Sequence, residues 1–225
     1  MIETVIQAAA LIVPLIVAIV FHEVAHGWVA RALGDPTAAE MNRLSLNPIR
    51  HVDPIGTIVL PGFLALVKAP VIGWAKPVPV NKWRLRNPRY GMMIVAAAGP
   101  ATNFVLAAMG AVLLGLLVRS YGRDTSEFIV TNLINFLQIN VFLALFNLLP
   151  LPPFDGSHIV EGLLPPAAAE KFERLRPYGF GLIILLLIVL PSLVPSLSIV
   201  ESFVVPPVQW AVGHYLGLAE AVAHL

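Results

Sequence analysis

The sequence predicts an all-α polytopic membrane protein, with about five transmembrane helices and a re-entrant, partly extended segment between the first two. The composition is one reason, because 58% of the 225 residues are hydrophobic and only 12% are charged, against about 25% charged in soluble domains. The apolar residues form long runs, and no stretch has the composition of a soluble domain. Residues 1–225 are therefore expected to form one membrane-embedded domain, with a core over about 5–165 and C-terminal spans over about 178–222.

The first three predicted spans are apolar runs of about 20 residues, the length that crosses a bilayer. The first covers about Val5–Ala30, and Gly34-Asp35-Pro36 ends its helix. This run lacks a basic leading region, so a cleaved signal peptide is not expected. The second span covers about Met92–Val118. The third covers Phe128–Leu149 and contains several asparagines.

The remaining elements are less regular. A fourth span begins near Tyr178, and a fifth, weaker one covers about Val200–Val222. Between the first two spans, Gly56–Val67 is apolar but too short to cross, and it is rich in Ile, Val and Leu. We interpret it as a re-entrant or interfacial element that is partly extended. Ala75–Val80 contains alternate prolines, which favour an extended, polyproline-like path.

Basic residues lie mainly on one side of the predicted spans. Segment 31–91 contains nine Lys and Arg residues and loop 150–177 contains three, against two between the second and third spans. By the positive-inside rule, the first two segments are cytoplasmic and the N-terminus faces out; with five spans, the C-terminus faces in. We expect a multi-pass protein of the cell membrane, surrounded by the lipid bilayer. The net charge of +1 gives no indication of nucleic-acid binding.

The pattern His22-Glu23-Val24-Ala25-His26 lies near the cytoplasmic end of the first span. Residues four apart share one face of a helix, so the two histidines can reach one ion, and HExxH is a zinc signature. Ionisable residues inside a membrane are costly and usually functional. Zinc leaves a position for a water whose pKa falls to about 7, and Glu23 is placed to act as general base and then proton donor. The alternative is two satisfied core histidines beside a buried glutamate.

A third zinc ligand is needed, and the absence of cysteine leaves His, Asp and Glu as candidates. Asp155 follows a proline-rich stretch just beyond the cytoplasmic end of the third span, at the depth predicted for His22 and His26. The prolines prevent ordinary helix and can turn the chain back toward the bundle. The alternative is an ordinary Asp-Gly turn at a helix end. We expect one Zn²⁺ per chain, bound by His22, His26 and Asp155.

Other polar residues are weaker candidates. Asn103 and Asn147 lie within or beside spans and could donate hydrogen bonds to a substrate backbone or an oxyanion. The alternative is hydrogen bonding between helices, which is the preferred interpretation for Asn132, Asn135 and Asn140. His158, close behind Asp155, could support the metal site from outside the ligand set.

With these motifs in place, the chain resembles the site-2 protease family of intramembrane zinc metalloproteases, in its short bacterial and archaeal branch without a PDZ or CBS domain. His22–Gly27 matches the family's HExxH helix, and Asn147–Gly156 matches its second motif, which supplies the third ligand. The supporting matches are Leu44–Pro48, His51–Thr57, Gly73–Asn81 and Ala98–Asn103. The resemblance covers roughly residues 15–165. One departure is Asn42, where the family pattern has a glycine before the arginine.

The resemblance implies an endopeptidase that hydrolyses peptide bonds in or near transmembrane segments of membrane proteins, in regulated intramembrane proteolysis. The substrate helix must unwind locally, and Gly56, Thr57 and Ile58 are candidates for a strand edge that holds it. Substrate filtering would need a separate regulatory or adaptor protein. The alternative function is a membrane zinc transporter or metal sensor with the same ligands, although a transport path would favour acids and histidines on several spans.

Overall fold

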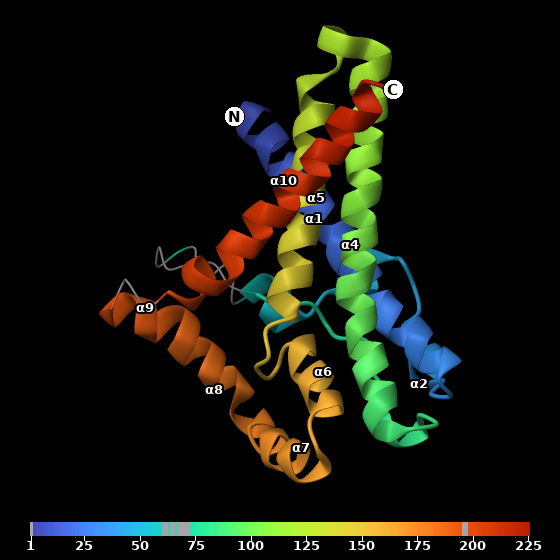
Figure 1. Ribbon diagram of the computed structural model, residues 1–225, viewed down its shortest axis with the longest axis vertical. Coiled ribbons are helices and arrows are strands. Elements are labelled where there is room, and N and C mark those ends of the chain that lie inside the picture. The colour runs from blue at the N-terminus through green and yellow to red at the C-terminus, as the bar shows by residue number, and fades with distance from the viewer. Residues whose placement is uncertain (1, 60–62, 64–65, 67–72, 195–197) are drawn as a thin grey trace.

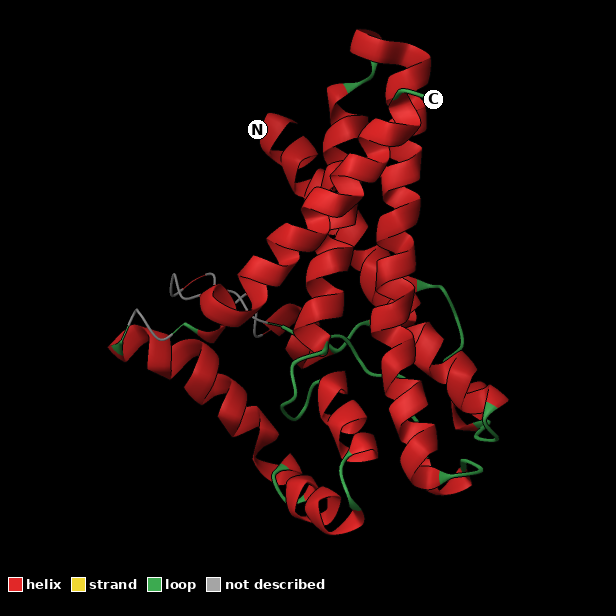
Figure 2. Cartoon of the chain, in the orientation of Figure 1, coloured by secondary structure: helices red, strands yellow, loops and turns green. Residues whose placement is uncertain are grey.

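The computed structural model describes residues 2–59, 63, 66, 73–194 and 198–225. Every regular element in these ranges is helical, as Figure 2 shows, and this agrees with the all-α prediction. The three longest helices are α1 (Ile2–Ala32), α4 (Pro88–Tyr121) and α5 (Glu127–Asn147). Among the described helices, these three are long and apolar enough to cross a membrane. The protein therefore has the helices of a membrane protein, and a helix long and apolar enough to cross lies at each of the first three predicted spans.

The C-terminal part differs from the two predicted spans. Three consecutive helical pieces, α8 (Gly179–Ile184), η6 (Leu185–Val189) and α9 (Leu190–Leu193), replace the fourth span. The fifth corresponds to η8 (Val200–Val204) and α10 (Val205–Ala223). No helix here is among those apolar and long enough to cross, so the described residues do not confirm five spans. Figure 1 shows both termini at the same end of the bundle, whereas five spans would place them at opposite ends.

The helices α1, α4, α5 and α10 form one bundle, in which α4 contacts the other three (Figure 1). The core between α4, α5 and α10 consists of small and branched apolar side chains. Gly115 of α4 lies against α10, because a Cβ there would stand 2.4 Å from the carbonyl oxygen of Ala219. Small residues of this kind let membrane helices approach closely, which gives van der Waals contact without a hydrophobic driving force.

Local signals explain where the helices begin and end. Asn87 precedes α4 and accepts a hydrogen bond from the Tyr90 amide at 3.1 Å, while Pro88 occupies the first helical position. Gly122 ends α4 with a φ of +53°, which favours glycine.

The short elements that connect the long helices are α2 (Thr37–Glu40), η1 (Pro48–His51), η3 (Lys82–Arg84), η4 (Gly122–Asp124), α6 (Asp155–Leu163), α7 (Pro166–Glu173) and η5 (Arg176–Tyr178).

The beginning of the predicted re-entrant segment is helical, not extended. Residues Pro54–Val59 form the π-helical turn η2. Asp53 starts this turn, because its side chain accepts hydrogen bonds from the amides of Ile55 at 3.0 Å and Gly56 at 2.7 Å. The prediction of a strand edge is therefore wrong for Gly56, Thr57 and Ile58. Most of the rest of Gly56–Val67 lies outside the described residues.

Residues 73–81 lie in neither helix nor strand, in agreement with the path predicted for Ala75–Val80. The buried side chain of Arg43 holds this segment by donating to the carbonyl oxygen of Lys76 at 2.8 Å. Asn42, just before that arginine, has a φ of +53°. Asparagine tolerates this left-handed region better than other residues with a Cβ. The geometry therefore explains how Asn42 can stand where the family pattern has glycine.

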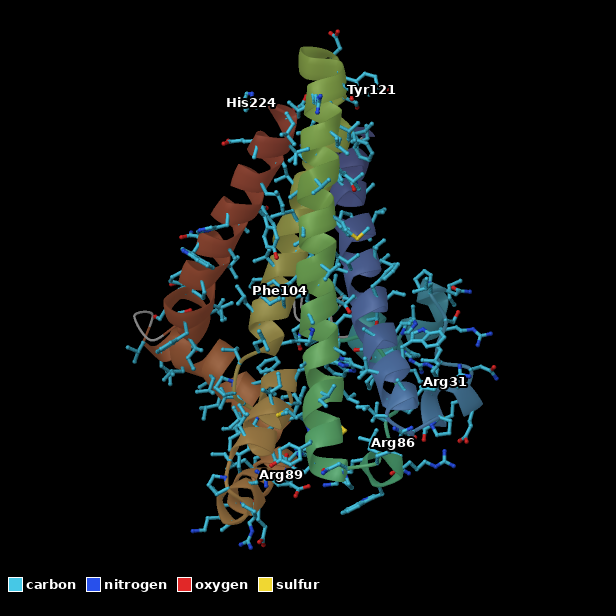
Figure 3. All side chains as sticks on the ribbon, turned by 45° about the vertical axis from the view of Figure 1, so that its right-hand side comes forward. Arg31, Arg86, Arg89, Phe104, Tyr121 and His224 are labelled. Carbon is cyan, nitrogen blue, oxygen red and sulfur yellow. The ribbon has the colours of Figure 1, made fainter. Side chains whose placement is uncertain are left out.

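The charged segments gather at one end of the bundle. Figure 3 shows Arg31, Arg86 and Arg89 in its lower part, and Tyr121 and His224 at the opposite end. In Figure 1, α6 and α7 lie at the lower end as well. The labelled arginines of segment 31–91 and the helices of loop 150–177 therefore lie toward the same end of the molecule. The side of the membrane that this end faces remains a prediction from the charge pattern.

Candidate metal centre

The two histidines of the HExxH pattern lie one turn apart on α1 and face the same point. Their side chains are almost enclosed, with 7% of His22 and 9% of His26 exposed. The imidazole rings are 4.7 Å apart between centroids and nearly perpendicular. Their Nε2 atoms lie 3.1 Å and 3.4 Å from Oδ2 of Asp155. The structure thus brings together the three residues that the sequence suggests as ligands.

Asp155 reaches this point because the chain folds back after α5. Prolines at 150, 152 and 153 interrupt the helix, and α6 begins at Asp155. Gly156 makes the return possible: a Cβ at this residue would lie 2.3 Å from the carbonyl oxygen of Leu148. The Asp-Gly pair is therefore more than a simple turn. It presents a carboxylate to α1 and leaves room for the end of α5.

The donor set fits a zinc ion. Oδ2 of Asp155 is buried and has no hydrogen-bond partner, although both imidazoles lie within ion-pair distance. The two rings approach this oxygen without hydrogen-bond geometry, so the three ligand atoms, all within 4.8 Å of one another, converge on a point between them. Two imidazole nitrogens and one carboxylate oxygen are ligands that zinc accepts. Among the described residues, no other His, Asp or Glu joins this group.

The charge state of Asp155 suits a metal ligand. Burial alone raises the pKa of its carboxyl group, but the imidazoles of His22 and His26 outweigh burial and lower that pKa to about 2. The carboxylate is therefore ionised at neutral pH, as a ligand must be. A buried anion facing two imidazoles forms a site suited to a divalent cation.

Helix α4 supports both imidazoles from behind. Nδ1 of His22 lies 2.6 Å from Oδ1 of Asn103, and Nδ1 of His26 lies 2.7 Å from the carbonyl oxygen of Val95. Gly99, between these two contacts, permits the close approach, because a Cβ there would lie 2.6 Å from atoms of both rings. Apart from the matched stretch Ala98–Asn103, nothing in the sequence pointed to Gly99 or to the Val95 carbonyl.

Glu23 points to the extended segment 73–81. Its Oε2 accepts a hydrogen bond from the backbone amide of Val78 at 2.7 Å. The side chain of Val78 packs on Gly27, because a Cβ at Gly27 would lie 2.8 Å from Cγ1 of Val78. Sequence reasoning missed Val78 as a functional residue. The signal that could have found it is Pro77-Val78-Pro79, in which Val78 carries the only backbone N–H.

The weaker candidates have other partners. Asn103 is fully buried, and both ends of its amide are engaged inside the bundle. Asn147 donates to the carbonyl of Leu143 in its own helix at 2.9 Å. Thr57 donates from its hydroxyl to the Trp74 carbonyl at 2.9 Å. None of these contacts involves a substrate. Substrate binding therefore stays a prediction for Asn103, Asn147, Gly56, Thr57 and Ile58. For the last three, the helical turn η2 rules out binding through a strand edge.

His158 lies beyond the ligand group, beside a second charged cluster. Both of its ring nitrogens lie 3.2 Å from the guanidinium of Arg176, which also forms an ion pair with Glu161. Burial and the positive charge of Arg176 lower the pKa of His158 to about 4. The imidazole is therefore neutral at pH 7. The cluster connects α6 to η5 and so positions the helix that carries Asp155.

Comparison with known proteins adds independent findings. The sequence model of a family described as peptidase family M50 matches residues 115–190, which include Asp155. The chain is 43% identical to "Putative zinc metalloprotease YwhC" of Bacillus subtilis, over 80% of each chain. It is 28% identical to "Putative zinc metalloprotease Rip2" of Mycolicibacterium smegmatis, over 76% of this chain and 63% of Rip2. It is 30% identical to "Putative zinc metalloprotease MJ0611" of Methanocaldococcus jannaschii, over 63% and 64%. No solved structure matches the chain.

Proposed function

The chain belongs to peptidase family M50, the site-2 proteases, and on this premise we propose that it is an intramembrane zinc metalloendopeptidase. The observation that carries the proposal is the convergence of His22, His26 and Asp155 on one point beside Glu23. The names of the relatives support a zinc metalloprotease. The proposed substrate is a membrane protein, cut in or near a transmembrane segment.

Each residue has a distinct role in this proposal. His22, His26 and Asp155 would hold the ion, through the Nε2 atoms of the two imidazoles and Oδ2 of the carboxylate, which face one another. When bound, zinc lowers the pKa of water to about 7 and polarises a carbonyl group. Glu23 then takes the proton of the attacking water on its carboxylate and passes it to the amide nitrogen that leaves. The Val78 amide restricts the orientation of that carboxylate.

The position of the site on α1 supports cleavage in or beside the bilayer. His22 and His26 lie inside Ala9–Ala32, the part of α1 that is apolar enough to cross a membrane. The ligands are enclosed by α1, α4 and α6, so a substrate peptide must come close to these helices. Because backbone groups in a helix are already hydrogen-bonded, the scissile bond must leave its helix before it is attacked. We place the site toward the cytoplasmic end of the bundle, following the distribution of basic residues.

The proposal is tested by three purified variants, each assayed for zinc content and for cleavage of a transmembrane test substrate. Glu23→Gln should retain zinc and lose cleavage, because it keeps the shape of the side chain and removes the base. Asp155→Ala should lose most of its zinc, because a ligand is gone. The matched control is Glu127→Gln, which changes an exposed acid at the start of α5 and should behave like wild type.

The same variants separate a peptidase from a zinc transporter or sensor. A transporter that uses these ligands needs no general base, so Glu23→Gln would still move zinc into vesicles and wild type would cleave nothing. Full cleavage by Glu23→Gln would contradict the proposed mechanism. Normal zinc content in Asp155→Ala would contradict the proposed ligand set.

A further inference from the structure

Two asparagines lie completely inside the membrane bundle. Asn103 of α4 and Asn140 of α5 are both 0% exposed. A buried amide without partners is costly in an apolar environment, and the oxygen and nitrogen of both amides have partners: Asn103 contacts α1 and α5, and Asn140 contacts α4 and its own helix. One end of this chain of hydrogen bonds is His22.

The hydrogen bonds fix how each amide is turned. Nδ2 of Asn140 donates to the Phe136 carbonyl at 2.8 Å. A carbonyl can only accept, so the nitrogen of Asn140 must face it, and its oxygen must face Asn103. Nδ2 of Asn103 then donates to this oxygen at 2.8 Å and to the Ala18 carbonyl at 3.2 Å. Only the oxygen of Asn103 is left to face His22.

The same reasoning reaches the imidazole. Oδ1 of Asn103 lies 2.6 Å from Nδ1 of His22 and cannot donate, so Nδ1 must carry the hydrogen. In the neutral ring, the lone pair is then on Nε2, the atom that faces Asp155. A metal ion needs that lone pair, and the partner of the other ring nitrogen decides where it is.

We propose that Asn140 and Asn103 are positioning residues, which together hold His22 in the tautomer that can bind a metal ion. Asn140 turns the amide of Asn103, and Asn103 accepts the Nδ1 proton of His22. His26 needs no such pair, because a backbone carbonyl, that of Val95, accepts from its Nδ1. The inference rests on the metal site of the proposed function, but it does not require peptidase activity.

The competing explanation is that these amides only join helices α1, α4 and α5. Asn135 provides a matched control, because it also joins two helices: its Nδ2 donates to the Ala10 carbonyl at 2.9 Å. It lies on the same helix as Asn140, but its hydrogen bond to Ala10 is not part of the series that joins Asn140 through Asn103 to His22. If the asparagines serve only to join helices, Asn135→Leu and Asn140→Leu should have similar effects.

The first experiment measures the zinc dissociation constant of detergent-purified protein by competition with a chelator. Loss of a residue that supports a metal ligand typically weakens binding by roughly 10- to 100-fold. We expect a loss of this size in Asn103→Leu and a weaker loss in Asn140→Leu. Asn103→Asp should restore most of the affinity, because a carboxylate also accepts the Nδ1 proton. Asn135→Leu should bind zinc like wild type.

The second experiment needs neither zinc nor activity. Nitrogen NMR of zinc-free protein with labelled histidine should show His22 protonated on Nδ1 in wild type and in Asn135→Leu. The signal should become a mixture of tautomers in Asn140→Leu. The proposal is overturned if wild type carries the proton on Nε2, if Asn140→Leu leaves both the tautomer and the affinity unchanged, or if Asn135→Leu loses as much zinc as Asn140→Leu. If Asn103→Leu does not fold, the zinc affinity and His22 tautomer of Asn140→Leu, together with the wild-type spectrum, still test the proposal. A protein that passes both tests and cleaves no substrate would contradict the proposed function alone.

Discussion

At the scale of single residues, a close steric constraint beside the two imidazoles falls on a glycine of α4. Gly99 lets α4 approach both imidazoles, and a Cβ in its place would lie 2.6 Å from each ring. Helical glycines are usually replaceable, because alanine favours the helix by about 1 kcal/mol. Here the neighbouring atoms belong to the enclosed rings of His22 and His26, which cannot move apart without losing the point at which they converge with Asp155.

We therefore predict that Gly99→Ala weakens zinc binding by about tenfold or more, the range seen when a ligand's support is lost. The measurement is the zinc dissociation constant by chelator competition. Gly213→Ala in α10 is the control, because a Cβ there meets nothing within 4 Å; its zinc affinity should not change. Equal affinity in both variants would mean that the imidazoles do not need the close approach of α4.

The sequence predicted those site residues that carry chemistry in their own side chains. His22, Glu23 and His26 follow a recognisable spacing, and Asp155 stands out through its place after a span. It could not reveal the Val95 carbonyl, because every residue has one and only the fold decides which is used. The same holds for the turn of the Asn103 amide, which depends on its partners.

At the scale of elements, the extended segment 73–81 packs against α1, where Val78 contacts Glu23 and Gly27. Its Val78 amide is the one group there that reaches Glu23, and the prolines on either side remove the neighbouring N–H groups. The guanidinium of Arg43 holds the segment by donating hydrogen bonds to the carbonyl oxygens of Lys76 and Pro77. This arrangement restricts the carboxylate of Glu23, the proposed general base, from outside the candidate metal site.

We predict that Val78→Pro lowers the rate of cleavage by about tenfold or more and leaves the zinc content unchanged. The reason is that a hydrogen bond to a charged group contributes about 1.5–3 kcal/mol, and about 1.4 kcal/mol corresponds to tenfold in rate. The measurements are cleavage of a transmembrane substrate and bound zinc per chain. Val78→Ala keeps the amide and should retain far more activity. If the two variants were equally active, the amide would have no role.

Elements were predictable where the apolar run was long. The three long spans follow from composition, but short apolar stretches do not separate strand from helical turn. At Pro54–Val59, the helical turn is favoured over a strand because the Asp53 side chain accepts hydrogen bonds from the first backbone amides. At the C-terminus, prolines and polar residues such as Gln209, His214 and Glu220 reduce the apolar character of α10.

At the scale of the whole molecule, helix α6, which carries Asp155, is joined to the C-terminal part by a charged cluster that contains a neutral histidine. The groups that face His158 and affect its pKa are Arg176, Asp155, Lys82 and His26. Its pKa in the folded protein, about 4, is below the ordinary value of 6.5. The unfolded chain therefore binds this proton first, so folding stability falls as the pH drops from about 6.5 toward 4.

We predict that His158→Gln reduces this acid sensitivity. The measurement is the Tm of detergent-purified protein at pH 7 and pH 5, where wild type should lose more stability than the variant. Comparing the two proteins cancels the contribution of other titrating groups. His224→Gln, at the exposed C-terminal end, should keep the pH dependence of wild type. An unchanged pH dependence in His158→Gln would show that the buried imidazole does not contribute.

We propose that this bundle cuts a peptide bond at membrane depth with the candidate metal site on α1. The most direct measurement is mass spectrometry of products formed in lipid vesicles by zinc-loaded protein from a transmembrane substrate. We predict a cut within or next to the substrate's apolar segment, made by wild type and absent with Glu23→Gln. Cleavage confined to soluble segments far from the membrane, or equal cleavage by Glu23→Gln, would contradict it.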